Sequence, residues 1–276
     1  MPISVPSDPA PVTVRPVARR DFYDDPSTYD ILHAPGTATD VDGLERMALR
    51  FAPGRPHRHL WLEPACGTAR LLRVAAGRGR RVVGFDMSER MIDYANERLA
   101  ARGLTHRATL FVADMETFPR RRDPIGAHLA FNLINTIRHL QTDEALQRHF
   151  RAMARSLVPG AIYAVGLSLS DYVRERTSED VWEGARGRCR VTQVVQYIPP
   201  GRRARRERVV SHLVIERPRG AEHVDSTYGL RSYDAKQWRA AIEASPFTLE
   251  AVVDETGRDM RSPADGHAIF VLRAPG

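Results

Sequence analysis

The sequence contains little cysteine and almost no lysine, and it has no long apolar run. Its two cysteines, Cys66 and Cys189, lie far apart, so neither a disulfide framework nor a metal-ligand spacing is present. No apolar run approaches the roughly 18 residues that span a bilayer, and the first 20 residues contain no apolar signal core. We therefore expect a soluble, cytoplasmic protein without a metal.

The positive charge comes almost entirely from arginine. Of the 41 basic residues only Lys236 is a lysine, and the formal net charge is +7. A basic chain raises the question of a nucleic-acid partner, but an arginine bias in composition would give the same charge. With 276 residues, 42% of them hydrophobic, the chain can bury a sizeable core as one domain, alone or with a smaller insertion.

The most informative stretch is LWLEPACGTARLLRVAAGRGRRVVGFD, residues 60–86. An apolar run ends at Glu63, a turn of small residues follows, and a helical segment leads to a second apolar run that ends at Asp86. A glycine such as Gly67 lets a ligand approach the backbone, and a carboxylate at the end of the next strand suits a ribose diol. The stretch predicts a nucleotide-type site.

Strand-like and helix-like segments alternate on both sides of that stretch. We expect helices over 39–51, after Ser88 to Gly103, and from Thr142 to Pro159 and Gly160. We expect further strands over 109–114, 127–135 and 161–169. This alternation is typical of an α/β doubly wound parallel sheet.

The period changes after the fifth strand. Three strand-like runs, 189–198, 208–217 and 223–233, are joined tightly enough to be antiparallel, and a helix over 234–244 with strands over 247–254 and 267–274 follows. We predict four parts: a mobile tail (1–18), a helical cap (19–58), a core (59–170 and 232–276) and an antiparallel β insertion or lid (171–231).

Acidic residues end three consecutive predicted strands, at Glu63, Asp86 and Asp114. The carboxyl ends of parallel strands form the ligand-binding edge of such sheets. Asp86 can accept both ribose hydroxyls, and Asp114 or its backbone can accept an adenine amine between the polarizable walls of Met87 and Met115. The pattern predicts a nucleoside site.

Four motifs resemble the class I S-adenosylmethionine-dependent methyltransferases: EPACGTA (63–69), GFDMSERMIDYA (84–95), VADME (112–116) and LVPGAIY (157–163). The resemblance implies a seven-stranded sheet with a reversed last strand and S-adenosylmethionine as cofactor. It implies that Glu63 and Gly67 surround the methionine portion, that Asp86 binds the ribose, and that Asp114 and Met115 lie at the adenine. The other expected cofactor contacts are Tyr29, Ala65, Met87, Met91 and Asn132.

FNLINTIRHLQTDEAL, with the insertion after strand five, is similar to the branch that methylates small molecules, including N,N-dimethyltransferases of amino sugars. That resemblance implies catalytic roles for His139, near the acceptor amine, and for Tyr29, which with Asp30 covers the cofactor. A neutral histidine can serve as base or orienter, although His139 could equally cap the following helix. Asn135 and Arg231 are further candidate substrate residues, with an Arg231–Asp234 ion pair as the alternative.

The predicted function is methyl transfer to N or O of a small molecule. One alternative is an RNA or DNA methyltransferase, suggested by the arginine clusters at 119–123 and 201–208, although no Asn/Asp-Pro-Pro-aromatic turn follows strand four. Another is a non-catalytic cofactor-binding protein. An NAD-dependent oxidoreductase is disfavoured by Asp114 and by the paired closing strands. Exposed strand edges in the insertion leave a homodimer open.

Overall fold

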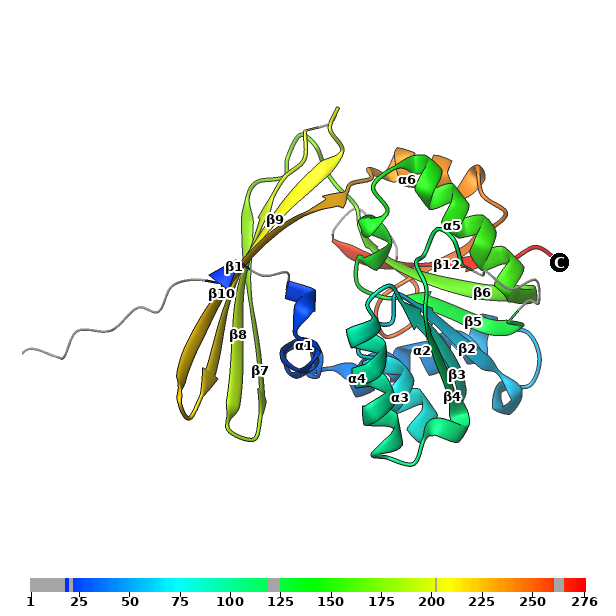
Figure 1. The fold of residues 1–276 in the computed structure, drawn as a ribbon. Helices are drawn as coiled ribbons and strands as arrows, with labels where there is room; N and C mark the ends of the chain where they lie inside the picture. The colour runs from blue at the N-terminus through cyan, green and yellow to red at the C-terminus, as the bar shows by residue number, and fades with distance from the viewer. Residues whose placement is uncertain (1–17, 20–21, 119–124, 202, 261–265) are drawn as a thin grey trace, which may run out of the picture.

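The computed structural model describes residues 18–19, 22–118, 125–201, 203–260 and 266–276. The chain forms two β-sheets that stand side by side (Figure 1). One has seven strands and helices on both faces, and the other is a separate five-stranded sheet. The arginine cluster at 119–123 and the predicted tail up to residue 17 lie outside the described residues.

The seven-stranded sheet has the order β11-β12-β6-β5-β2-β3-β4. The neighbours from β4 across to β6 pair in parallel, and β12 is antiparallel to both β6 and β11. The doubly wound sheet with a reversed last strand is therefore confirmed. Its strands are β2 Leu60–Pro64, β3 Arg81–Asp86, β4 Ala108–Val112, β5 Ala127–Asn132, β6 Leu157–Ser168, β11 Thr248–Val253 and β12 His267–Arg273.

Three of the core helices, α4, α5 and α6, begin at side chains that accept backbone N–H groups. Ser88 caps α4, Thr142 caps α5, and Asp234 forms a capping box with Gln237 at α6. The predicted end of α5 is wrong: the helix ends at Ser156, so Pro159 and Gly160 lie within β6. Two strands also end earlier than predicted, β4 at Val112 and β5 at Asn132. The core helices are α2 Thr37–Phe51, α3 Arg70–Gly77, α4 Glu89–Ala100, α5 Asp143–Ser156 and α6 Ala235–Glu243.

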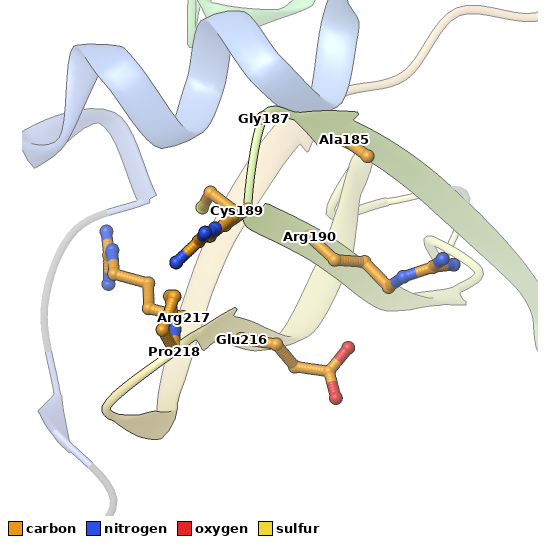
Figure 2. A pocket seen from close by; sticks show the side chains of 8 residues that line it. Ala185, Gly187, Cys189, Arg190, Glu216, Arg217 and Pro218 are labelled. Atoms are coloured by element: carbon orange, nitrogen blue, oxygen red, sulfur yellow. The ribbon is translucent and has the colours of Figure 1, made fainter.

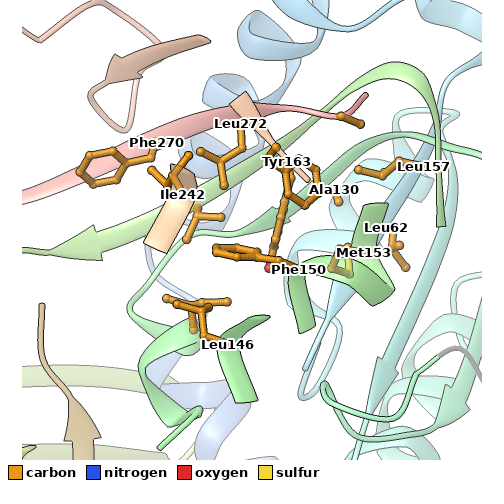
Figure 3. Packing of buried hydrophobic residues seen from close by; sticks show 14 of the residues in the cluster. Leu62, Ala130, Leu146, Phe150, Met153, Leu157, Tyr163, Ile242, Phe270 and Leu272 are labelled. Carbon is orange, nitrogen blue, oxygen red and sulfur yellow. The ribbon is translucent and has the colours of Figure 1, made fainter. Parts of the chain in front are cut away.

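Two apolar clusters fill the space between the sheet and its helices. Figure 3 shows the one beneath α5 and α6, where Phe150 and Met153 lie against Tyr163 and Leu272 of the sheet. The side chain of Trp238 is buried in this cluster. No helix in the described part of the chain is long and apolar enough to cross a bilayer.

The insertion forms the second sheet, with the order β1-β10-β9-β8-β7. Its four long strands are an antiparallel meander, and the short strand β1 Ala18–Arg19 adds to β10 in parallel. The antiparallel insertion is confirmed, but the sequence analysis expected three strands and missed β7. The strands are β7 Ser178–Arg186, β8 Cys189–Ile198, β9 Arg206–Arg217 and β10 Gly220–Arg231.

Helix α1 Pro26–His33 packs on the inner face of the insertion sheet. Ile31 and Leu32 form an apolar cluster with Val191, Leu213 and other residues of that sheet. Gly184 of β7 permits this approach, since a Cβ atom there would lie 2.2 Å from the Ile31 carbonyl oxygen. The N-terminal segment therefore joins the insertion to the core.

Candidate active site

The turn between β2 and α3 passes close beneath the ring of Tyr29. Ala65, Gly67 and Ala69 all have positive φ, at 50°, 52° and 53°. The Cys66 amide donates to the Phe85 carbonyl at 2.9 Å, which holds the turn against β3. A Cβ atom on Gly67 would lie 3.5 Å from Cε1 of Tyr29. We call residues 65–69 the cofactor loop.

Asp86 lies at the end of β3 and binds this loop directly. Its Oδ2 accepts the Gly67 amide at 2.8 Å, and its Oδ1 accepts the Ser88 amide at 2.9 Å. Burial raises the pKa of Asp86 above its ordinary value, although these N–H donors oppose the rise. Each carboxylate oxygen can accept a further hydrogen bond, so the group is placed to receive both hydroxyls of a ribose.

Glu63 supplies a buried acceptor without a protein donor. Its side chain is 8% exposed, and Oε2 has no hydrogen-bond partner among the described residues. Burial raises the pKa of Glu63 well above its ordinary value, and the nearby Arg70 opposes this. An ammonium group bound here would restore the missing hydrogen bond and stabilise the carboxylate, as the α-amino group of S-adenosylmethionine can.

Tyr29 is protonated at neutral pH. Burial raises the pKa of its phenol to about 12, with Arg70 lowering it and Asp86 and Glu63 raising it. The three acidic or phenolic groups therefore lie near one another at the cofactor loop. A phenol with this pKa can donate a hydrogen bond or pack over a ligand, but it is a poor proton acceptor.

Exposed apolar side chains lie at the carboxyl ends of three strands of the seven-stranded sheet, β3, β4 and β5. Met87 after β3 is 77% exposed, Val112 at the end of β4 is 51% exposed, and Ile134 after β5 is 45% exposed. These exposures suit a surface that an adenine or an acceptor would cover. Val112 and Ile134 were missed in the sequence analysis because each continues an apolar strand-like run. Met91, in the first turn of α4, is buried.

The Asp114 carboxylate organises its own turn. Oδ1 accepts the amides of Glu116 at 2.8 Å and Thr117 at 2.9 Å. The carbonyl of Met115 lies 2.9 Å from Nδ1 of His149. The loop after β4 is thus held in a fixed shape beside Asp86, whose carbonyl accepts the Ala113 amide at 3.0 Å.

The amides of both predicted asparagines bind protein groups. Asn132 donates to the Pro64 carbonyl at 2.6 Å and accepts from the Tyr163 hydroxyl. Asn135, in left-handed conformation beyond β5, accepts the Ser168 amide at 2.9 Å and donates to its hydroxyl at 3.1 Å. In this arrangement they shape the edge of the sheet through these bonds.

His139 is part of an aromatic group that spans the core, the N-terminal segment and the insertion. Its Nε2 lies 3.3 Å from the hydroxyl of Tyr23, and its ring stacks on Tyr228 of β10 at 5.8 Å between centroids. Tyr23, in η1 Phe22–Asp24, also lies 5.8 Å from the Tyr29 ring. We call Tyr23, His139 and Tyr228 the aromatic cluster.

The short helix η4 Thr136–His139 is held to the insertion on both sides of His139. Arg138 donates to the Arg231 carbonyl at 2.8 Å and forms an ion pair with Glu207 at 2.7 Å. Gln141 donates to the Gly229 carbonyl at 3.0 Å. The insertion thus lies beyond the carboxyl end of β5.

The Arg231 side chain has a different partner from the one considered in the sequence analysis. Its guanidinium lies 3.2 Å from Asp143, which also binds Arg205 at 2.7 Å. Asp234 instead caps α6. The Arg231–Asp234 pair was wrong because Asp143, at the start of α5, is brought to the base of the insertion by tertiary packing.

A shallow depression of about 460 Å³ lies at the hairpin turns of the insertion (Figure 2). Arg190, Glu216 and Arg217 line it, together with the free thiol of Cys189. None of the predicted site residues contributes to this lining. The described residues contain no group of three or more His, Cys, Asp or Glu side chains suited to a metal ion.

Comparisons with known proteins agree with this geometry. Residues 62–160 match the family described as "Methyltransferase domain". No curated protein sequence matches the chain. The fold is similar to an S-adenosylmethionine-dependent methyltransferase from Clostridium acetobutylicum, at 12% identity and a TM-score of 0.71, covering 91% of this chain and 97% of that one.

Two further solved structures cover nearly all of both chains. The sugar N-methyltransferase KedS8 from Streptoalloteichus is 20% identical, with a TM-score of 0.70, and covers 98% of this chain and 100% of that one. The amino pentose methyltransferase CalS10 from Micromonospora echinaspora, solved with S-adenosylmethionine, is 19% identical, with a TM-score of 0.64 and coverages of 95% and 100%. The insertion sheet is therefore part of the shared fold.

Proposed function

We propose that this protein, an S-adenosylmethionine-dependent methyltransferase, transfers the methyl group to the amino nitrogen of a small acceptor that resembles an amino sugar. The observation that carries the proposal is the aromatic cluster. It places a histidine between the carboxyl edge of the sheet and the insertion, where an acceptor can meet the cofactor. The similarity to KedS8 and CalS10 supports an amino sugar in particular.

The core residues bind and orient the cofactor, which supplies a methyl group already activated by a positively charged sulfur. Glu63 accepts its ammonium group, and Asp86 accepts the ribose hydroxyls. Met87 and Met115 flank the adenine, with Val112 beside them, and Tyr29 covers the loop at Gly67. With the methyl group activated, the remaining task of the protein is to align the acceptor and exclude water.

The acceptor site lies under the insertion. An acceptor amine that is protonated at neutral pH must lose this proton before its nitrogen can attack. The Tyr23 hydroxyl, 3.3 Å from His139 Nε2, can accept the proton from the acceptor while it passes its own proton to Nε2. The rings of Tyr23 and Tyr228 can stabilise a substituted ammonium group through cation–π contact. Tyr29 contributes by position, since its phenol keeps its proton. In this proposal the core holds the cofactor, and the N-terminal cap and the insertion hold the acceptor.

One arginine of the cluster behind the nucleic-acid alternative is engaged within the protein. In the cluster at 201–208, Arg205 pairs with Asp143 and also packs over the Tyr233 ring at 5.0 Å. These contacts give Arg205 a structural role at the base of the insertion.

A methyl-transfer screen tests the proposed function. The protein and S-adenosylmethionine are incubated with amino sugars, free and nucleotide-linked, with other small amines and hydroxyl compounds, and with RNA and DNA. Formation of S-adenosylhomocysteine and of methylated product is followed by mass spectrometry, with Asp86→Ala as the inactive control. We expect turnover on an amino sugar. Methylation of RNA or of a hydroxyl compound, with no amine accepted, would overturn the proposal.

We also propose a cytoplasmic homodimer. The two cysteines are unpaired, as in a reducing compartment, and β7 presents an uncovered edge on the insertion sheet. Sedimentation at several protein concentrations should give twice the monomer mass. A monomer at high concentration would contradict the second part of this proposal.

A further inference from the structure

Arg186, the last residue of β7, reaches from the insertion to the core. One guanidinium nitrogen donates to Oδ2 of Asp30 at 2.7 Å, and the other donates to the hydroxyl of Tyr94 at 2.9 Å. The Tyr94 hydroxyl in turn donates to the same carboxylate oxygen at 3.0 Å. Because Asp30 belongs to α1 and Tyr94 to α4, this one side chain bonds the insertion to both helices.

The other oxygen of Asp30 faces the cofactor loop. Oδ1 accepts the hydroxyl of Thr68 at 3.0 Å and also binds Arg73 of α3. Thr68 follows Gly67 in the loop, and Tyr29, whose ring lies over Gly67, precedes Asp30. A single carboxylate therefore fixes both the loop and the residue that covers it.

The carboxylate is fully buried, at 0% exposure, and is ionised at neutral pH. Burial alone would raise the pKa of Asp30, but Arg73 and Arg186 together hold it below its ordinary value. Removing one of two guanidinium partners from a buried carboxylate leaves its charge partly uncompensated. The group would then move toward its remaining partner or toward water, and Tyr29 and Thr68 would move with it.

We infer that Arg186 is a positioning residue, which couples the docking of the insertion on α1 to the shape of the cofactor loop. It acts through Asp30 and touches neither cofactor nor acceptor. The inference rests on the cofactor assignment and is independent of which acceptor is methylated. The insertion would thus influence cofactor affinity as well as acceptor binding.

Calorimetric titration with S-adenosylhomocysteine tests the inference. We expect Arg186→Gln to raise the dissociation constant about tenfold, the effect of losing one well-placed interaction. Arg190→Gln is the matched control, because Arg190 is an exposed arginine of the same hairpin, on β8 (Figure 2), and we expect it to bind as the wild type does. Arg186→Lys keeps the charge but loses the forked geometry, so it should give an intermediate affinity.

Tryptophan fluorescence supplies a second readout. Trp182, on the same strand, lies 5.7 Å from the His33 ring, which lies 4.4 Å from Tyr29. We expect S-adenosylhomocysteine to change the fluorescence in the wild type and in Arg190→Gln, and to change it less in Arg186→Gln.

The possible outcomes separate three cases. A lower melting temperature for Arg186→Gln with a dissociation constant within twofold of the wild type would reduce Arg186 to a structural role and overturn the inference. If Arg186→Gln did not fold, Arg186→Lys would replace it: a dissociation constant within twofold of the wild type, with a lower melting temperature, would likewise overturn the inference. Failure of the wild type to bind S-adenosylhomocysteine would instead count against the cofactor assignment.

Discussion

The cofactor edge and the insertion are built in different ways. At the cofactor edge, the carboxyl edge of the sheet where we propose that the cofactor binds, the proposed binding groups follow one another along the chain: Glu63, the loop at Gly67 and Asp86 belong to one strand–helix–strand unit. In the aromatic cluster, Tyr23, His139 and Tyr228 come from three distant segments. A local unit fixes its geometry through short-range turns, whereas a dispersed site depends on how separate elements dock.

This difference predicts that substitutions at the two regions have separable effects. Residues of the cofactor edge should govern cofactor affinity, and residues of the aromatic cluster should govern turnover. Arg186 is an exception to this division, because it lies in the insertion and should nevertheless affect cofactor affinity.

The largest effect is expected at Asp86. Asp86→Ala removes the carboxylate that is placed for two ribose hydroxyls, and hydrogen bonds to a charged group contribute roughly 1.5–3 kcal/mol each. We expect S-adenosylhomocysteine affinity to fall on the order of 1,000-fold and the thermal stabilisation by this ligand to disappear. Asp93→Ala, at an exposed position of α4, should keep both, as thermal denaturation with and without ligand will show. Stabilisation by NADH and not by S-adenosylhomocysteine would contradict the cofactor assignment.

His139 tests the other side of the comparison. His139→Ala should lower kcat about 100-fold, the usual contribution of a general base, while the dissociation constant for S-adenosylhomocysteine stays within twofold. The measurement pairs steady-state kinetics on the acceptor found in the screen with calorimetry, and exposed His106 supplies the control substitution. An unchanged kcat would leave His139 with only a structural role in the loop before α5.

The smallest expected effect is the pH dependence of stability that His149 causes. His149 is buried with Nδ1 on the Met115 carbonyl and Nε2 2.8 Å from the Tyr163 hydroxyl, and burial lowers its pKa to about 4. In the unfolded chain His149 takes up a proton below about pH 6.5, but in the folded chain it does so only near pH 4. The contribution of neutral His149 to the free energy of unfolding is therefore fully present above pH 6.5 and is lost as the pH falls toward 4. At pH 5 the loss should be about 2 kcal/mol.

Urea unfolding of the wild type and of His149→Gln between pH 8 and pH 5 measures this contribution. The variant should lose less stability over that interval, whatever its absolute stability at pH 8, and His106→Gln should follow the wild type. Parallel curves for the wild type and His149→Gln would show that other groups cause the acid loss.

The two regions also differ in what their residue patterns could predict. The doubly wound sheet and the positions of Glu63, Gly67 and Asp86 follow from apolar runs that end in small or acidic residues, whereas the reversed last strand was implied by the resemblance to the methyltransferases. Strand β7 was missed because SEDVWEGAR is mostly polar and exposed, and lacks the apolar content of a typical strand. Strand β7 is exposed because it lies at the edge of the insertion sheet, and this position depends on how the four long strands pair with one another.

The contacts of single side chains were the hardest to foresee. Asn132 was a candidate cofactor contact and Arg231 a candidate substrate residue, but their protein partners Tyr163 and Asp143 lie more than ten residues away in the chain. Tyr228 and Arg186 carried no local signal, since a tyrosine and an arginine within strands are common. Each acquires its contacts only when the insertion docks on α1 and η4.

The docking of α1 at Gly184 has a consequence for exchange of parts between related enzymes. Ile31 and Leu32 pack against the insertion sheet, whereas the preceding residue, Asp30, accepts a hydrogen bond from Thr68 of the core. In a chimera that receives only the insertion of a related enzyme, a foreign strand would pack against the backbone of this helix. Any residue other than glycine at position 184 of that strand would collide with the helix backbone. The N-terminal helix and the insertion, far apart in the sequence, form one interchangeable unit and would have to be transferred together.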